Sequence, residues 1–168
     1  GDHTVERKFR QQQLEISIKT GIIEDQVTAY IGLAQHQIAI KNWAVAIEYV
    51  DLARKIIVKK PDSFLEIYIL LTEGDIFEGK GELKQAIKVN QQARRLAEDN
   101  DYQGLEISSA TNIVEFFLQE KKFELVVEKA EKLLVQSRKI RLQSKTLQLH
   151  SILKQAYESL EDYKKALR

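Results

Sequence analysis

Apolar residues return every three or four positions along most of this chain, which is the spacing of one face of an α-helix. The pattern is clearest in two runs: Ile113, Val114, Phe117 and Leu118, then Val127, Ala130, Leu133 and Leu134. Seven Gly and one Pro leave few turn formers, which favours long helices over an all-β domain. The pattern predicts helices over residues 4–20, 24–41, 43–59, 63–80, 83–99, 103–121, 123–138 and 142–160, and from 163 onward.

The helical pattern itself repeats along the chain. Bulky residues stand 40 residues apart at Trp43, Leu83, Phe123 and Tyr163. Smaller residues follow three positions later at Ala46, Ala86, Val126 and Ala166. A fixed period of about 20 to 50 residues indicates a solenoid, in which each unit is one small group of helices. We therefore predict helix pairs joined by tight turns.

Turn and cap residues agree with this period. Asn42 and Asp162 are expected to cap second helices, because a short side-chain oxygen can accept a backbone N–H there. Gly81 occupies an equivalent turn, where a left-handed backbone costs glycine little. The stretch SFLE at 63–66 is typical of a capping box that starts the next helix. The residue pairs 42–43, 82–83, 122–123 and 162–163 should therefore each open a second helix.

The repeating residues resemble those of the tetratricopeptide repeat (TPR) family, whose pattern alternates small and aromatic positions around a tight turn. The resemblance is carried by Gly74, Phe77, Gly81, Leu83, Ala86 and Ala93, and again by Tyr157, Asp162, Tyr163 and Ala166. The chain departs from the family in its longer period, in the loss of the Pro that usually ends the second helix, and in Val114 and Val126 at small positions.

The resemblance implies an all-α fold, an α–α superhelix built as a TPR-like solenoid of antiparallel helix pairs. Residues 1–168 would be one solenoid fragment, with units near 1–23 (partial), 24–62, 63–102, 103–141 and 142–168 (partial). It also implies a protein- or peptide-binding scaffold. The longer units are similar to those of bacterial signalling and transcription-regulatory proteins, so we expect the regulatory or sensory region of such a protein.

Composition and charge limit the cellular compartments and the classes of partner expected for this chain. Lys and Arg number 26 against 25 Asp and Glu, so total charge does not point to nucleic acid or membranes. No apolar run approaches the ~20 residues that cross a bilayer. The absence of Cys excludes disulfides and leaves a mild preference for the cytoplasm. The absence of Met and the start at Gly1 are typical of a piece cut from a longer chain.

Candidate catalytic groups do not converge in the sequence. His3, His36 and His150 lie far apart, and none has a partner at the spacing of a helical metal site. The two glycines of EGKGE at 78–82 lack the rest of a phosphate-binding loop. We therefore expect no enzyme activity, no metal and no cofactor.

In the resembled family, the first helix of each unit lines a concave groove. That rule assigns the groove to Gln35, Ile38, Tyr68, Leu71, Asp75, Glu78, Thr111, Asn112, Glu115 and Gln155. The charges among them are acidic, which favours a partner segment that carries Lys or Arg. It disfavours a ligand held by its terminal carboxylate, since the clamp for that ligand needs Lys, Arg and Asn. The alternative is a merely solvated groove, with the contacts made by repeats outside this chain.

A basic stretch at 132–154 offers a second hypothesis, a nucleic-acid-binding solenoid. Between Lys132 and Tyr157 there are basic residues and no acid, and we take Arg138, Lys139, Arg141 and Lys145 as its patch. The simpler interpretation is that Arg138 and Lys139 complement the dipole at a helix C-terminus. Uncovered repeat ends also favour self-association.

Overall fold

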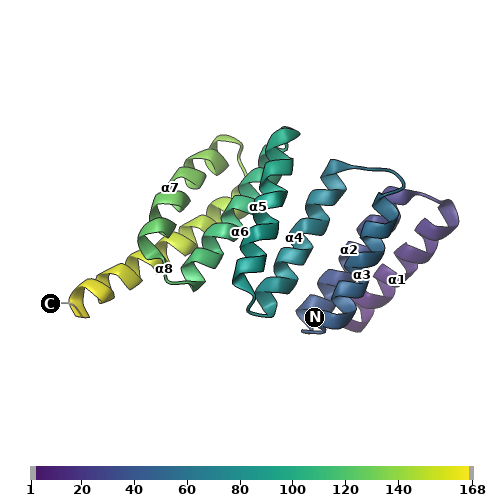
Figure 1. Cartoon of the computed structure of the whole chain (residues 1–168), viewed down its shortest axis with the longest axis horizontal. Helices are drawn as coiled ribbons and strands as arrows, with labels where there is room; N and C mark the ends of the chain where they lie inside the picture. Colours follow the sequence, from purple (N-terminus) through teal and green to yellow (C-terminus); the bar gives the residue numbers. More distant parts are fainter. Residues whose placement is uncertain (1–2, 167–168) are drawn as a thin grey trace.

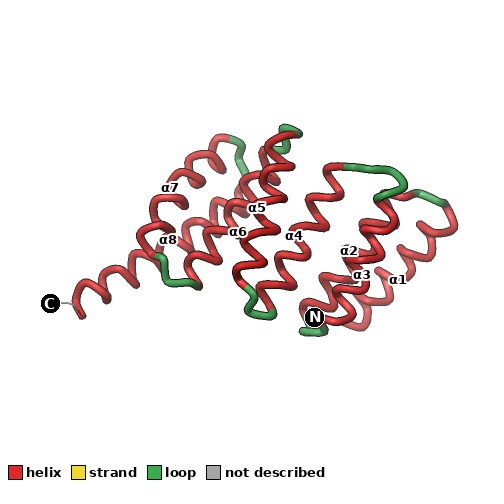
Figure 2. Tube along the Cα trace, viewed as in Figure 1, coloured by secondary structure: helices red, strands yellow, loops and turns green. Residues whose placement is uncertain are grey.

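The computed structural model of the chain describes residues 3–166, and the side chains of residues 8–161. It contains eight α-helices in this range and no strand (Figures 1 and 2). They are α1 (His3–Thr20), α2 (Ile23–Ala39), α3 (Trp43–Ile57), α4 (Ser63–Gly79), α5 (Leu83–Asp99), α6 (Gln103–Gln119), α7 (Phe123–Lys139) and α8 (Gln143–Ala166). The prediction of an all-α array is confirmed.

Helices begin at intervals of 20 residues, from Ile23 to Gln143, which is half the period seen in the sequence. The cause is a recurring left-handed residue just after a helix end. Positive φ angles, between 56° and 77°, occur at Gly21, Lys41, Gly81, Asp101, Lys121 and Arg141. The equivalent position between α3 and α4 is occupied by Pro61, whose ring excludes a positive φ. There α3 ends early, at Ile57, and a longer connection follows.

Backbone hydrogen bonds close these turns in the Schellman pattern, in which an N–H beyond the helix end bonds to a carbonyl five residues back. The N–H of Asn42 donates to the Gln37 carbonyl over 2.9 Å, and the N–H of Glu82 donates to the Phe77 carbonyl over 2.8 Å. The turn before α7 repeats this bond. The turns at 42–43, 82–83 and 122–123 are therefore equivalent, as the period predicted.

The predicted turn at 162–163 is wrong, because α8 runs unbroken from Gln143 to Ala166 and contains both residues. Each tight turn places a residue in a left-handed conformation, which costs a non-glycine residue about 1–2 kcal/mol. Packing of the following helix offsets that cost at Lys41 and Lys121. Within α8 the backbone at Asp162 and Tyr163 stays helical, so no left-handed residue is needed there.

Two predicted caps also differ in detail. Asn42 holds the N-cap position of α3, but its amide donates to the Gln37 side chain over 3.0 Å instead of accepting a backbone N–H. At α4 the cap is Asp62 and not Ser63, since the Asp62 carboxylate accepts from the Leu65 N–H over 2.9 Å. Ser63 is already the first helical residue.

The helices pack as a two-layered array in which α1 lies at one end and α8 at the other (Figure 1). The even-numbered helices contact one another in series, α2 with α4, α4 with α6, and α6 with α8. Among the described residues no backbone contact joins α3 with α5 or α5 with α7. The layer whose helices approach more closely is the inner side of a curved array. Helices α2, α4, α6 and α8 therefore form the inner face, and α3, α5 and α7 the outer face.

Small side chains allow the close approach within pairs. Ala46 and Ala86, which follow the recurring bulky residue, are fully buried. Ala53 and Ala93, about two helix turns later, are also fully buried. The aromatics Trp43, Phe77 and Phe117 are half-buried, in keeping with a packing role. Tyr157 was expected to do the same, but it is 47% exposed and its hydroxyl donates to Glu131 on α7 over 2.7 Å.

Candidate protein-binding surface

The inner face carries nearly all of the groove residues predicted from the sequence. The exposed members are Gln35, Tyr68 and Gln155, and the half-buried members are Ile38, Leu71, Asp75, Glu78, Asn112 and Glu115. They come from all four inner helices, and they therefore share one surface.

Two residues of α6 depart from that assignment. Thr111 does not line the groove, because it is fully buried and its hydroxyl donates to the Ile107 carbonyl over 2.7 Å. Asn112 donates its amide to the buried Asn90 of α5 over 3.2 Å, so it points into the helix packing and away from a ligand. Both sit one or two positions off the exposed stripe of α6, an offset too small for sequence spacing to resolve.

A chain of polar contacts crosses the inner face from α4 to α8. Gln119 of α6 donates to Glu78 of α4 over 2.5 Å. Gln148 of α8 donates to Glu115 of α6 over 2.7 Å and accepts from Lys145 over 2.9 Å. Two of the predicted acids are therefore held by amides of the next helix. The repeat pattern did not indicate Gln119, because its partner Glu78 lies 41 residues away.

Asp75 is different from the other acids of this face. Its half-buried carboxylate forms no hydrogen bond or ion pair within the described part of the chain, although Lys145 lies close enough to act on it electrostatically. The pKa of Asp75 is raised to about 6, chiefly by burial and next by the Glu78 carboxylate; Lys145 opposes the shift and Glu115 adds to it. Partial burial without a hydrogen-bond partner disfavours the ionised carboxylate, and an additional cation close to it would lower that cost.

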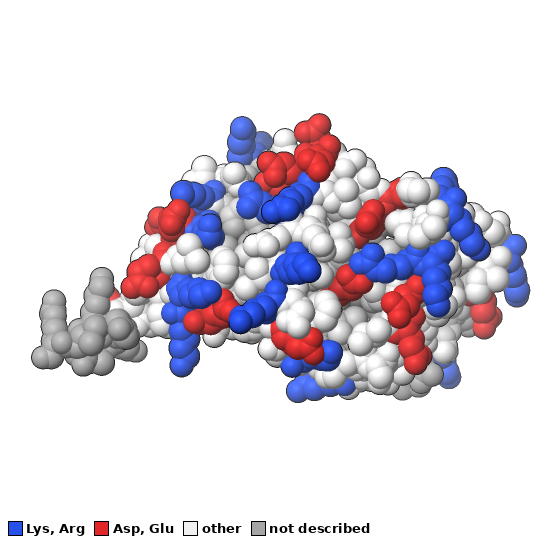
Figure 3. Space-filling model, in the orientation of Figure 1, with Lys and Arg blue, Asp and Glu red and all other residues white. Residues whose placement is uncertain are grey.

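The basic residues predicted as one patch are divided by the fold. Lys145 faces the inner surface beside Glu115 and Asp75, and burial lowers the pKa of its ammonium group. Arg138, Lys139 and Arg141 are exposed around the turn between α7 and α8. The Arg138 guanidinium lies 2.9 Å from the His150 ring. Figure 3 shows Lys and Arg interspersed with Asp and Glu over the visible face, as a mixed-charge surface would be.

An aromatic pocket lies at one end of the inner face, where α4 and α6 begin. Phe64, Tyr68 and Tyr102 meet there, with the Phe64 ring centroid 5.0 Å from that of Tyr68 and 5.6 Å from that of Tyr102. The pocket has a volume of about 360 Å³, and it is also lined by Gln103, Gly104, Leu105, Ser108 and Leu142. Phe64 is 43% exposed and Tyr68 36% exposed, so these two rings together present an apolar surface to solvent. Sequence reasoning named Tyr68 but missed Phe64 and Tyr102, which stand at helix starts outside the repeat pattern.

Within the described residues, no group of three or more His, Cys, Asp or Glu side chains could hold a metal ion. No helix in the same range has the length and apolar character needed to span a bilayer.

Comparison with known proteins identifies the fold. No family model matches the chain, and no curated protein matches it. Among solved structures, BtubC (BKLC) from P. vanneervenii is similar, with a TM-score of 0.78 and 15% sequence identity over 99% of this chain and 70% of that one. The TPR-like repeats of a putative kinesin light chain from Podospora anserina are also similar, with a TM-score of 0.63 and 14% identity over 98% of this chain and 88% of that one. The chain thus has a TPR-like fold, an array of helical repeats.

Proposed function

We propose that this chain is a peptide-binding scaffold whose inner face takes an extended partner segment carrying Lys or Arg. The observation that supports this most is Asp75, a half-buried carboxylate that forms no hydrogen bond or ion pair in the described structure. A cationic side chain placed there would restore the interaction that burial removed, and charge-assisted hydrogen bonds of this kind are strong.

The spacing of the helices suggests how such a segment would be arranged. Packed helices lie about 8–10 Å apart, and an extended chain advances about 3.3 Å per residue. A basic residue at every third position would therefore meet one inner helix after another, beginning at Asp75 and continuing to Glu115. An aromatic or aliphatic residue of the same segment would occupy the pocket of Phe64, Tyr68 and Tyr102, because exposed rings favour apolar partners.

A defined peptide tests this proposal. The probe is a fluorescein-labelled peptide of about 12 residues with Lys at every third position and one Phe near its end, measured by fluorescence anisotropy. Asp75→Asn combined with Glu115→Gln should weaken binding roughly tenfold, because two carboxylates are lost while shape is kept. The matched control neutralises two exposed acids of the outer helices, Asp51→Asn and Glu98→Gln.

The control variant has the same net charge as the test variant, so it separates a specific site from general attraction. If both variants bind the peptide equally well, the inner face is not the binding site. Circular dichroism checks that both variants keep the helical fold.

The wider setting is a further part of the proposal. The scaffold would be the regulatory or sensory repeat region of a larger bacterial signalling or transcription-regulatory protein, would act in the cytoplasm, and would have no catalytic activity of its own. The likeness of its 40-residue units to the repeats of such proteins supports this. The reading frame around this sequence is the test: an adjoining output domain is expected, and a frame that encodes repeats alone would contradict it.

The alternative, nucleic-acid binding through residues 132–154, has less support because Lys145 is half-buried near Glu115 and Asp75, whereas Arg138, Lys139 and Arg141 are exposed. An oligonucleotide in the same assay separates the two. Phosphate binding would fall steeply between about 50 and 200 mM salt.

A further inference from the structure

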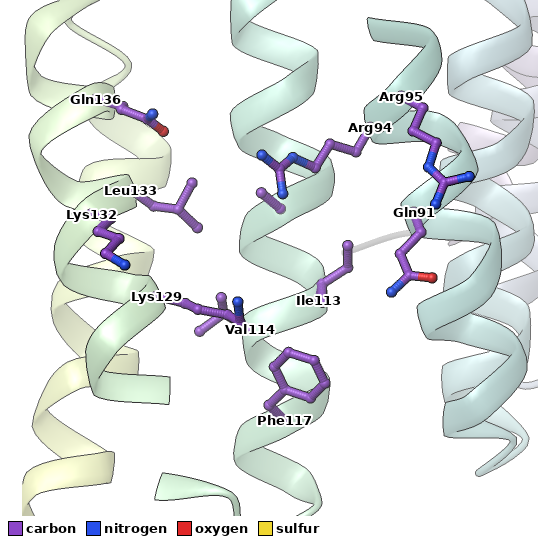
Figure 4. A pocket seen from close by; sticks show the side chains of 11 residues that line it. Gln91, Arg94, Arg95, Ile113, Val114, Phe117, Lys129, Lys132, Leu133 and Gln136 are labelled. Atoms are coloured by element: carbon purple, nitrogen blue, oxygen red, sulfur yellow. The ribbon is translucent and has the colours of Figure 1, made fainter. Parts of the chain in front are cut away.

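A groove on the outer face lies between α5 and α7, where the two helices do not touch and α6 forms the floor. Figure 4 shows Gln91, Arg94 and Arg95 on α5, Ile113, Val114 and Phe117 on α6, and Lys129, Lys132, Leu133 and Gln136 on α7. Its volume is about 460 Å³, within the usual range of about 300–1,000 Å³ for ligand sites. This groove lies on the opposite side of the array from the inner face.

The charges on this groove all have one sign. Four cations line it, Arg94 and Arg95 from one wall and Lys129 and Lys132 from the other, and no Asp or Glu side chain takes part in the lining. The floor is apolar, formed by Phe117 and its neighbours. A ligand that fits both features must combine negative charge with an apolar side.

The internal partners of these cations are few. Arg94 approaches Glu106 at 3.4 Å, and Lys132 pairs with Glu128 at 2.7 Å in an exposed pair on the same helix. Exposed pairs of this kind are weak and easily exchanged. Arg95 and Lys129 form no hydrogen bond or ion pair with any other described residue, although Lys129 acts electrostatically on the neighbouring Glu128. Each wall therefore carries one cation without a directly bonded partner.

The corresponding groove one unit earlier shows that this charge pattern is local. It lies between α3 and α5 and is lined by Arg54, Glu66, Leu70, Gln92, Arg95, Leu96 and Asp99. Two acids balance two bases there, and Arg54 is already held by Glu73 through two bonds of 2.7 and 2.6 Å. The α5–α7 groove therefore has an excess of positive charge that the α3–α5 groove lacks.

We propose that the α5–α7 groove binds an acidic, amphipathic segment of a partner protein. Its apolar side chains lie on Phe117 and Leu133, and its carboxylates face Arg94, Arg95, Lys129 and Lys132. Gln91 and Gln136 at the rim supply both donors and acceptors, which suit a peptide backbone. The lining residues on α6 and α7 span about two helix turns, or roughly 10 Å, which matches two turns of a helical segment.

The experiment uses a labelled peptide of about 12 residues with Leu and Phe four positions apart and Glu at most other positions. Arg95→Glu combined with Lys129→Glu should raise the dissociation constant at least about tenfold, since repulsion replaces attraction. The matched control, Lys88→Glu with Lys139→Glu, reverses two exposed bases on the same helices that do not line the groove. It should bind nearly as well as the unmodified chain.

Three further arms complete the test. Replacing Leu and Phe of the peptide by Ser should abolish most binding, and the variant with Asp75→Asn and Glu115→Gln should bind the acidic peptide normally. Arg95→Ala with Lys129→Ala repeats the measurement if the Glu variant fails to fold. The proposal is overturned if the unmodified chain does not bind, if the control variant loses as much affinity, or if the Ser peptide or an oligonucleotide of equal charge binds as tightly.

Discussion

The carboxamide of Asn90 lies directly against Gly74, so closely that a Cβ on Gly74 would stand 2.2 Å from Asn90 Nδ2. Asn90 is fully buried, donates to the Ala86 carbonyl over 3.0 Å and accepts from Asn112 over 3.2 Å. It thus ties α4, α5 and α6 together at the centre of the array. The small residue at position 74 is what leaves space for this amide.

Gly74→Ala should therefore destabilise the chain by about 1–3 kcal/mol, because Asn90 must move and leave buried polar groups unpaired. Gly104→Ala is the matched control, since nothing lies within 4 Å of a Cβ there and alanine favours a helix. The control should be neutral or slightly stabilising. Urea denaturation gives both values, and equal effects at the two positions would show that Asn90 does not constrain Gly74.

At the left-handed turn residues, removing a glycine and introducing one should have opposite effects on stability. Gly81→Ala should cost about 1–2 kcal/mol, since its φ of 77° is unfavourable for alanine. Lys121→Gly should be neutral or stabilise by up to about 1 kcal/mol, because its φ of 59° suits glycine. Lys88→Gly, in the interior of α5, is the control and should cost about 1 kcal/mol. A loss at Lys121 as large as that at Lys88 would contradict the turn argument.

Asp75 should make stability depend on pH in a defined direction. The pKa of Asp75 in the folded chain is about 6, above the ordinary value of 3.8, so folding favours its protonated form. The penalty is greatest above pH 6 and disappears as pH falls towards 4. Asp75→Asn should therefore stabilise the chain by up to about 3 kcal/mol at pH 8 and have little effect at pH 4. Thermal melts at the two pH values measure the difference, and a gain that is the same at both would contradict it.

The same group should make binding of the Lys-bearing peptide depend on pH. Protonation of Asp75, whose pKa is about 6, removes the charge that pairs with the peptide. Affinity should be highest above pH 7 and fall several-fold between pH 7 and pH 5, and Asp75→Asn should show a flatter profile. Identical pH profiles of the two proteins in the anisotropy assay would exclude Asp75 from the binding site.

The sequence alone predicted the helices and most of the turns between them, because these depend on local chemistry. Apolar spacing and the recurrence of Trp43, Leu83 and Phe123 located the second helices of three units to the residue. The sequence could not predict that α8 continues through Asp162. A left-handed turn residue costs free energy, so such a turn forms only where the packing of the next helix offsets that cost. The side-chain cap at Asp62, in place of Ser63, was likewise decided by the backbone angles of the folded chain.

The surfaces were decided by the tertiary structure, because they depend on which helices meet. The helical register of the repeats predicted Asp75, Glu78 and Glu115 on one face. It also predicted Thr111 on that face, but Thr111 is buried in the fold. Lys145 was grouped with Arg138 by proximity in sequence, and the turn between α7 and α8 sends the two side chains to different surroundings. The cations of the α5–α7 groove come from residues more than 30 positions apart, as Arg95 and Lys129 do, and only the packing of both helices on α6 brings them to one groove.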